Sequence, residues 1–353
     1  MEVYLIAVDF HCKYQKVAWL NPETGETGHK NLSHERKEEV KEFYQQFPKG
    51  SVVALEASGY SWWFERLIEG LGHQLRVGHP TYIARMRLRR QKNDQVDTDH
   101  ILALLARKEF PEIWRGTVWQ REQKMVIRHR VKLVRERTRW INRLRALASN
   151  FNLVIKRGNL SQASRAKIGQ LEMGVELEAL RDEMLDRIEA LDEKVSRLDE
   201  KIKLWCEVDA DARRVETIPG IGPITALYLV RVLGPIERFS RLKQVAAYLG
   251  LDTLEHSSNN LFVPRCYGSI SRQGERVLRW LLVQCAQSAA RHNPQLRRFY
   301  LRLLHRRGRS VAKVAVARKL LVYAAVMLRD QIDYEEFLRR GSVRDLPARN
   351  HGL

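Results

Sequence analysis

The order of strand-like and helical segments in the first 110 residues restricts the fold more than any other feature of the sequence. Four segments are short, mostly apolar and rich in β-branched residues, which predicts strands: residues 3–11, 15–20, 51–57 and 74–78. Helical patterns follow the second, third and fourth of them, at about 33–46, 62–71 and 94–106. Strands first, then an alternation of strands and helices, predict a mixed α/β sheet layered by helices.

Two acidic residues lie in strands of this predicted sheet. Asp9 lies within the first apolar strand, and Glu56 lies at the carboxyl end of the third. An unpaired buried carboxylate is costly, so each of them needs a cation or several hydrogen-bond donors. A salt bridge would meet that need, and so would a bound metal ion.

Two further acids begin the helix that follows. Asp94 and Asp97 are one helical turn apart and project from one face, whereas Asp99 is rotated from Asp97 by about 200°. Asp94 could be a helix N-cap, with the others favouring the positive end of the helix. Alternatively, the four acids Asp9, Glu56, Asp94 and Asp97 gather at the carboxyl ends of the strands and hold divalent ions for phosphoryl chemistry.

The net charge points to a polyanionic partner. The 353 residues include 62 Lys and Arg against 42 Asp and Glu, a formal charge of +20. Nucleic acid is the partner that this excess favours, and an anionic membrane surface is the weaker alternative. The sequence has no apolar run of about 18 residues and no signal-peptide pattern, so we expect a cytoplasmic protein that does not cross a membrane.

Basic residues concentrate between positions 116 and 157. This stretch has twelve Lys and Arg against two Glu, with apolar residues at helical spacing. A solvated helix face normally carries both signs of charge, so the shortage of acids favours phosphate contacts over ordinary surface charge. The residues predicted to contact nucleic acid here are Arg128, Arg130, Lys132, Arg135, Arg139 and Arg143.

A long amphipathic stretch follows this basic segment. Between Leu177 and Trp205, apolar residues recur every three or four positions with charges between them. This spacing predicts a coiled-coil seam of about four heptads. The seam could pack on a partner subunit or fold back within the chain.

The C-terminal half contains three short segments of interest. Gly220 and Gly222 flank an apolar residue between two helical stretches, which matches a helix-hairpin-helix motif that contacts phosphate, or else a tight structural turn. The segment Ser257-Ser258 is, taken alone, a polar turn. Beyond it, residues 268–279 contain glycines and basic residues and lead into a helix. Three of these residues are further predicted nucleic-acid contacts: Arg272, Arg276 and Arg279.

Together these motifs resemble a known family. The segments that carry the resemblance are residues 7–9, 55–59 and 92–97, then 257–260 and 268–279. They resemble the DEDD-type insertion-sequence transposases, a family with a RuvC-like (RNase H-like) N-terminal domain that also includes the Piv/MooV DNA invertases. This sequence departs from the family pattern at Asn93 and Thr98, and Asn259 replaces the usual Gly after the serines.

The resemblance implies a mechanism and partners. It implies that the four acids bind one or two Mg²⁺ ions, with Mn²⁺ as a substitute. It further implies that Ser258, or its neighbour Ser257, forms a covalent phosphoserine link to DNA. The implied partners are double-stranded DNA at the element ends and target, a structured guide (bridge) RNA, and further copies of the chain in a dimer or tetramer held by the coiled coil.

We therefore predict a transposase and site-specific DNA recombinase of the bacterial nucleoid. The predicted parts are a RuvC-like DEDD domain at 1–115, a basic helical segment at 116–165, a coiled coil at 166–207, an all-α transposase domain at 208–335 and a tail at 336–353. Two alternatives are a RuvC-like Holliday-junction resolvase that uses water as nucleophile and a non-catalytic helix-hairpin-helix DNA-binding protein.

Overall fold

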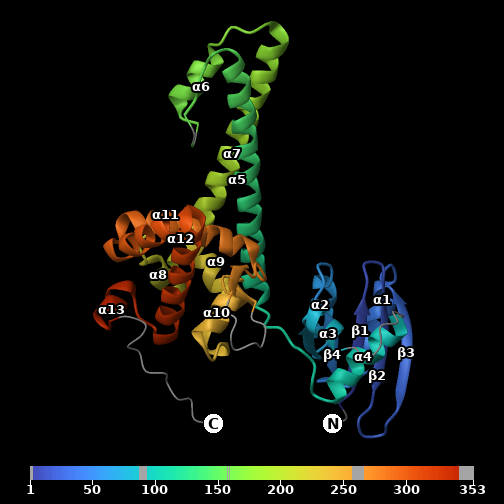
Figure 1. The fold of residues 1–353 in the computed structure, drawn as a ribbon. Coiled ribbons are helices and arrows are strands. Elements are labelled where there is room, and N and C mark those ends of the chain that lie inside the picture. Colours follow the sequence, from blue (N-terminus) through green and yellow to red (C-terminus); the bar gives the residue numbers. More distant parts are fainter. Residues whose placement is uncertain (1–2, 87–93, 157, 159, 257–265, 342–353) are drawn as a thin grey trace. The chain divides into compact units, whose positions relative to one another are not determined.

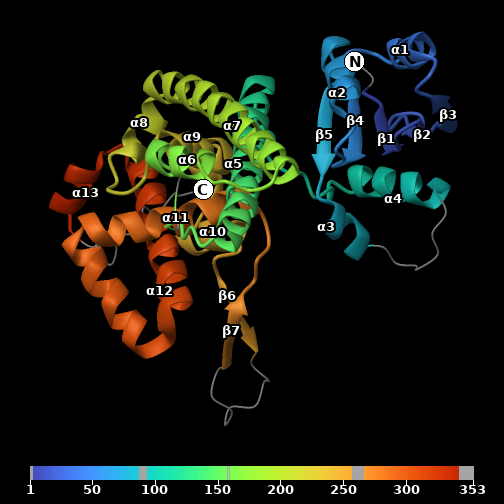
Figure 2. The same ribbon diagram turned by 90° about the horizontal axis from the view of Figure 1, so that it is seen from above.

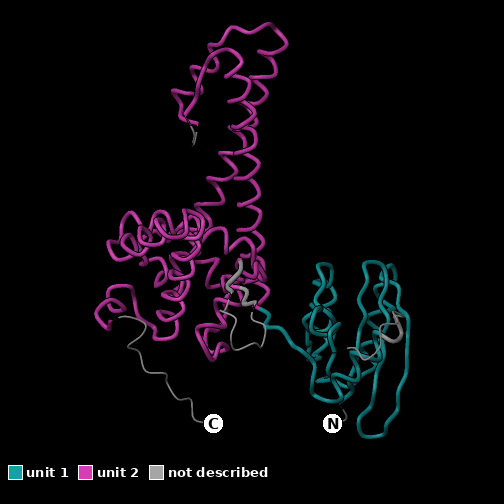
Figure 3. The backbone as a smooth tube through the Cα atoms, in the orientation of Figure 1, with its two compact units in different colours: residues 1–115 teal, residues 116–353 magenta. Residues whose placement is uncertain are grey.

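The computed structural model describes residues 3–86, 94–156, 158, 160–256 and 266–341. The chain divides into two compact units, residues 1–115 and 116–353 (Figure 3). Each unit has its own hydrophobic core. Among the described residues, none of the helices combines the length and the apolar character that a membrane span requires.

A five-stranded mixed sheet forms the centre of the first unit, with the strand order β3-β2-β1-β4-β5 (Figure 1). The strands β1, β4 and β5 are parallel, whereas β2 runs antiparallel to both of its neighbours. The strands are β1 (Leu5–Phe10), β2 (Tyr14–Leu20), β3 (Thr27–Ser33), β4 (Val52–Glu56) and β5 (Gln74–Gly78). The predicted mixed α/β sheet is confirmed, and it is consistent with a DEDD nuclease-like fold.

Helices cover both faces of this sheet (Figure 2). They are α1 (Lys37–Gln45), α2 (Trp62–Gly70), α3 (Pro80–Arg85) and α4 (Asp94–Ala106). Because side chains alternate along a strand, Val8 and Leu55 face one layer and pack with α1 and α2. Ala7 and Ala54 face the other layer, where small side chains let α4 approach the sheet closely and bury Ile101.

Strand β3 was absent from the elements that the sequence predicts. It is polar, with only Leu32 fully buried, and the predicted helix from residue 33 begins only at Lys37. An edge strand pairs on one side only and tolerates exposed polar side chains, so it lacks the alternation that identifies inner strands.

Two long helices dominate the second unit, α5 (Val118–Asn150) and α7 (Val175–Glu207), with the short α6 (Gln162–Gly169) between them. They lie side by side (Figure 1) and bury shared clusters that include Leu144 with Ile188 and Leu133 with Leu191. Leu177 and Leu180 at the start of the apolar seam predicted on α7 are exposed, whereas its stretch from Met184 to Leu198 is covered by α5 of the same chain. A second subunit is not needed to bury it, which leaves oligomerisation through this seam without support from the fold.

The remaining helices pack around one large core, which contains most of the buried apolar residues of the second unit. They are α8 (Ala210–Glu216), α9 (Pro223–Leu233), α10 (Leu242–Tyr248), α11 (Arg276–His292), α12 (Pro294–Asp330) and α13 (Tyr334–Arg339), with a 3-10 turn η1 (Ile236–Arg238). A two-stranded hairpin, β6 (Thr253–His256) and β7 (Cys266–Ile270), leaves this helical body between α10 and α11 (Figure 2).

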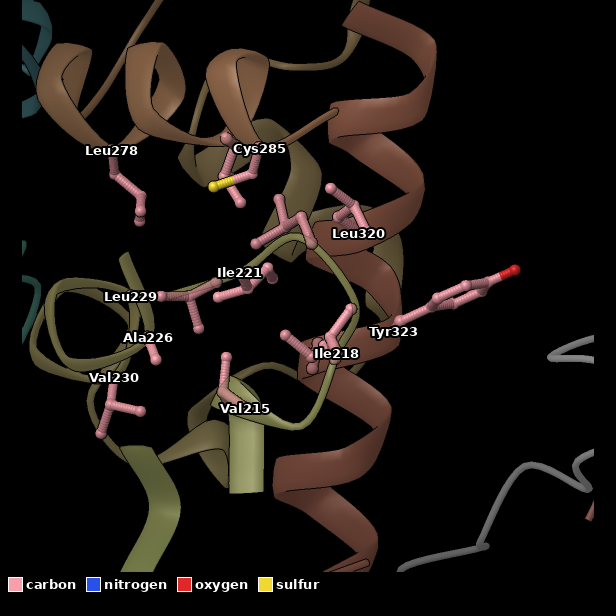
Figure 4. Packing of buried hydrophobic residues seen from close by; sticks show 14 of the residues in the cluster. Val215, Ile218, Ile221, Ala226, Leu229, Val230, Leu278, Cys285, Leu320 and Tyr323 are labelled. Atoms are coloured by element: carbon pink, nitrogen blue, oxygen red, sulfur yellow. The ribbon is translucent and has the colours of Figure 1, made fainter. Parts of the chain in front are cut away.

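The glycine-containing turn between α8 and α9 is packed into that core. Ile218 and Ile221 point into it among the side chains of α9, α11 and α12 (Figure 4). Gly220 has φ +89°, and a Cβ added there would lie 2.4 Å from the backbone nitrogen of Ala289 in α11. Gly222, the residue before α9, has φ −101° and open space around its Cα. The close approach that we predicted for both glycines therefore occurs at Gly220, and it is to a helix of this chain.

Replacing these glycines with alanine should have unequal effects. We expect Gly220→Ala to lower the free energy of unfolding by about 2–4 kcal/mol, since it adds left-handed backbone strain to a clash with backbone atoms. Gly222→Ala should cost about 0.5 kcal/mol, the difference between Gly and Ala at an N-cap. Thermal unfolding of the two variants measures this. Equal losses of stability would show that the close contact with α11 does not hold this turn.

Candidate active site

Asp9 and Glu56 lie at the carboxyl ends of two adjacent parallel strands. The register pairs Ala7 with Ala54 and Val8 with Leu55, so the next position of each strand holds Asp9 and Glu56. Side-chain alternation puts both acids on the face of Ala7 and Ala54, the face that α4 covers. Both side chains are partly buried. The two predicted strand acids therefore share one face and one edge of the sheet.

Asp97 approaches the same face from α4. It lies one turn before Ile101, which is buried between α4 and the sheet, and Asp97 is itself partly buried. Asp99 points elsewhere, as the helical period predicts: its carboxylate lies 2.6 Å from Nε2 of His29 on β3. Asp94 is the first residue of α4, and its side chain lies outside the described residues. Three of the four predicted acids are therefore placed, all on one interlayer face.

These carboxylates fit a divalent cation by their chemistry. Carboxylate oxygens are the hard donors that Mg²⁺ and Mn²⁺ prefer. Among the side chains that the structure describes, no group of three or more His, Cys, Asp or Glu residues is close enough together to hold a metal ion. The predicted ligand set also includes Asp94, so the metal remains a prediction that rests on the donor type and the shared face.

His11, which contacts Asp9, was not among the residues that the sequence analysis predicted for the site. Nε2 of His11 lies 3.0 Å from a carboxylate oxygen of Asp9, and its ring stacks on Tyr14 at 4.5 Å between centroids. His11 lies two residues after Asp9 and thus has the same side-chain parity, which is the signal that could have suggested the contact.

Two of the basic residues predicted on α5 are engaged within the chain. Arg130 donates two hydrogen bonds to the carboxylate of Asp199 on α7, at 2.6 and 2.8 Å. Arg128 donates to the hydroxyl of Tyr228 at 2.8 Å and pairs with Glu275. These bonds join α5 to α7, α9 and the start of α11, so they give both arginines a structural role alongside any contact with phosphate.

The other four predicted residues of α5 are exposed: Lys132, Arg135, Arg139 and Arg143. The guanidinium of Arg135 lies 5.1 Å from the ring centroid of Trp280, and that of Arg143 lies 4.7 Å from that of Trp140. A guanidinium held over an aromatic ring keeps its outer donors available for a phosphate. This face of α5 thus retains the features of the predicted nucleic-acid interface.

A cationic cluster that the sequence analysis did not select lies at the start of α5. Lys124 lies near Arg121, Arg128 and Arg238, with Glu275 as the acid among them. Burial, and then the charge of Arg128, lower the pKa of Lys124 to about 8. A phosphate would favour the charged form of Lys124, so the cluster suits a nucleic-acid backbone. The signal was its position one turn before Arg128.

The hairpin of β6 and β7 leads to the predicted nucleophile. Ser258 and its alternative Ser257 fall outside the described residues. Arg272 and Arg276 are exposed at the hairpin base. Arg279 donates to the carbonyl oxygens of residues 249, 272 and 273 at 2.8, 2.9 and 2.6 Å, which ties the two ends of the hairpin together. Its predicted role in nucleic-acid binding would have to operate alongside this anchoring.

Comparison with known proteins identifies the family. Two family models match, a DEDD transposase domain over residues 6–152 and a transposase domain of the IS116/IS110/IS902 family over residues 212–301. The transposase of insertion sequence element IS1111A from Coxiella burnetii is 31% identical over 76% of this chain and 75% of its own length. The chain belongs to the IS110/IS116/IS902 family of transposases. A DEDD-type domain in such a transposase is in general associated with divalent metal.

Other relatives agree with this transposase assignment. A probable family 20 transposase of Pseudomonas aeruginosa is 29% identical over 80% of this chain and 85% of its own length. The pilin gene-inverting protein of Moraxella lacunata is 25% identical over 80% of this chain and 82% of its own length. The predicted enzyme class, a DNA recombinase of an insertion sequence, is thereby confirmed, and DNA is its substrate.

Proposed function

We propose that this transposase cleaves and rejoins DNA strands at the edge of the sheet that carries Asp9 and Glu56, with Asp94 and Asp97 of α4 as the other two acids of the site. The observation that carries the proposal is the register of β1 and β4, which puts Asp9 and Glu56 side by side on the face that α4 covers. Catalytic residues in open α/β sheets gather at this edge. The four acids would hold one or two Mg²⁺ ions, with Mn²⁺ as a substitute. When bound, such ions polarise a phosphoryl oxygen and stabilise the charge that develops during displacement.

The chain's own residues perform the exchange. In the proposed step, Oγ of Ser258 attacks the scissile phosphorus, the new Oγ–P bond forms, and one bridging P–O bond of the strand breaks. The serine proton leaves during attack, and the released strand hydroxyl takes up a proton. A free serine hydroxyl is a weak nucleophile, so Ser258 needs a neighbouring group that accepts this proton. The phosphoserine link preserves the bond energy for religation.

Two kinds of partner complete the proposal. A structured bridge RNA would select the element ends and the target by base pairing, while the basic face of α5 contacts backbone phosphates without reading sequence. Several copies of the chain would assemble at the paired ends, since strand exchange needs more than one active site. The rival proposal is a resolvase-type nuclease with the same acids and water as nucleophile, which would form no link to DNA.

Trapping the covalent link tests the serine step. We expect the purified chain, incubated with Mg²⁺, its guide RNA and DNA that carries one element end, to give a protein–DNA adduct that survives denaturation. Ser258→Ala should abolish the adduct, and chelation of the metal should do the same. An adduct that survives in Ser258→Ala and is lost in Ser257→Ala would move the nucleophile by one residue. Cleavage that depends on Asp9 without any adduct would favour the nuclease.

A further inference from the structure

A row of polar side chains continues from the catalytic acids across the sheet. In register, Asp9 on β1 lies opposite Lys16 on β2, and Lys16 lies opposite Asn31 on β3. Paired residues share a face, so Lys16 and Asn31 lie on the same face as Asp9 and Glu56. Neighbouring strands are about 4.8 Å apart, which puts Asn31 about 10 Å from Asp9 along this row. The acids of β4 and β1 are thus followed by an amine on β2 and an amide on β3.

The outer half of the row opens into a cavity. Its volume is about 270 Å³, and it is lined by Lys16, Val17, His29, Lys30, Asn31 and Thr98. Thr98 belongs to α4 and follows Asp97 directly, so the cavity adjoins the helix end that carries the predicted metal ligands. His29 is held by Asp99 at 2.6 Å, so its ring is fixed at the cavity.

A second cavity extends the first one along β2 and β3. It measures about 390 Å³, and Lys16 and Asn31 line it too, together with Tyr14 and Arg36. The two cavities therefore share Lys16 and Asn31 at their junction. Both offer amine, amide and hydroxyl donors, which are groups that contact phosphodiester oxygens in protein–DNA complexes. The second also has the guanidinium of Arg36, which pairs with the carboxylate of Glu39 in the same lining. A ligand in these cavities would contact the positive charge of Lys16 and would lie next to the carboxylates of Asp9 and Glu56.

We propose that Lys16 and Asn31 form a binding subsite for the phosphodiester of the DNA strand next to the one that is cleaved. The amine of Lys16 and the amide of Asn31 follow the two acids along the row, and both groups can donate hydrogen bonds to phosphate oxygens. One phosphate would lie at the acids and its neighbour at the amine of Lys16, so the strand would cross β1 and β2 before leaving over β3. This subsite rests on the proposed function, since the acids define which phosphate is the reacting one.

The alternative role for Lys16 is structural. A lysine opposite an aspartate on a neighbouring strand can serve as a cross-strand charge pair that stabilises the sheet. A charge pair and a phosphate contact have different consequences when Lys16 is replaced. Loss of the pair lowers stability and leaves the salt dependence of DNA binding unchanged, whereas loss of the phosphate contact lowers affinity and the salt dependence together.

The test measures equilibrium binding of a duplex that carries one element end to the full chain, in EDTA, over a series of salt concentrations. We expect Lys16→Met to weaken binding about tenfold and to reduce the slope of log K against log salt by about one. Asn31→Ala, at an exposed position of the edge strand, should weaken binding about threefold with little change in slope. The matched control is Lys41→Met on α1, a helix that packs on the other face, which should bind as wild type does.

Binding in EDTA does not depend on the catalytic reaction, so the two proposals can fail separately. Asp9→Asn tests the proposed function through strand cleavage, and in EDTA it should bind the duplex at least as tightly as wild type, because it removes a negative charge beside the phosphate. The subsite is refuted if Lys16→Met and Asn31→Ala bind the duplex as Lys41→Met does. It is also refuted if they weaken only the binding of an RNA probe, because then the cavities hold the guide. A thermal unfolding curve for each variant identifies a loss of folding.

Discussion

Replacing Asp97 with asparagine should reduce DNA recombination by about 100- to 1000-fold, the loss typical of removing one group that stabilises the transition state. The carboxylate lies on the sheet-facing side of α4, above the strand ends that carry Asp9 and Glu56. Asparagine preserves the shape and loses the charge, so the fold should be retained while the site loses affinity for a cation. Excision of a marked element in cells, with protein amounts matched, measures the effect.

Asp99 provides the matched control on the same helix. It is two residues further along α4, is half-exposed and pairs with His29. Exposed pairs contribute about 0.2–1 kcal/mol, so Asp99→Asn should leave recombination within about fivefold of wild type. Equal losses in the two variants would show that α4 acts through its overall charge, and full activity in Asp97→Asn would remove this residue from the active site.

The shared face and edge of Asp9 and Glu56 could be predicted from sequence because strand periodicity and parallel pairing act together. An acid near the carboxyl end of an apolar strand needs a cation or hydrogen-bond donors beside it. Parallel strands bring their carboxyl ends to one edge of the sheet, so acids at these ends lie close together. The partner of the neighbouring acid Asp99 could not be predicted in this way. His29 meets Asp99 from 70 positions away, through the edge strand β3, whose polar sequence gave no sign of a strand.

The partners of the basic residues and of the seam on α7 could not be predicted, because they lie far away in the sequence. Arg130 and Asp199 are 69 positions apart, and only the packing of α5 on α7 makes them partners. The spacing of apolar residues predicted the seam of α7. A heptad pattern identifies the buried face of a helix, but it does not say which helix packs on that face. The glycines show the same limit, since the sequence does not reveal that Gly220 has a positive φ and lies against α11, whereas Gly222 has a negative φ and open space around it.

Among the glycine substitutions in the second unit, Gly274→Ala should have the largest effect on recombination. Gly274 has φ +71°, and a Cβ there would lie 2.0 Å from the carbonyl oxygen of Tyr248. On the opposite loop, Gly250 approaches the backbone of Gln273 just as closely. These two loops flank β6 and β7 and are tied by Arg279. Adding a methyl group should separate them, so we expect a loss of about 2–4 kcal/mol of unfolding free energy and a displaced hairpin.

The displaced hairpin should lower activity as well as stability. Because the hairpin carries the predicted nucleophile, we expect recombination by Gly274→Ala to fall by about 100-fold at temperatures where the chain remains folded. Gly308→Ala is the control: its φ of +80° is also positive, but the space around it is open, so only backbone strain of about 1–3 kcal/mol applies.

Arg279→Lys tests the same anchor without adding bulk. Lysine keeps the charge but cannot hold three carbonyl oxygens with one planar group, so recombination should fall while the salt dependence of DNA binding stays that of wild type. A reduced salt slope would instead assign Arg279 to a phosphate. Wild-type recombination in both Gly274→Ala and Arg279→Lys would mean that the base of the hairpin does not position the serine. The predicted nucleophile would then have to be aligned by the DNA or by the proposed guide RNA.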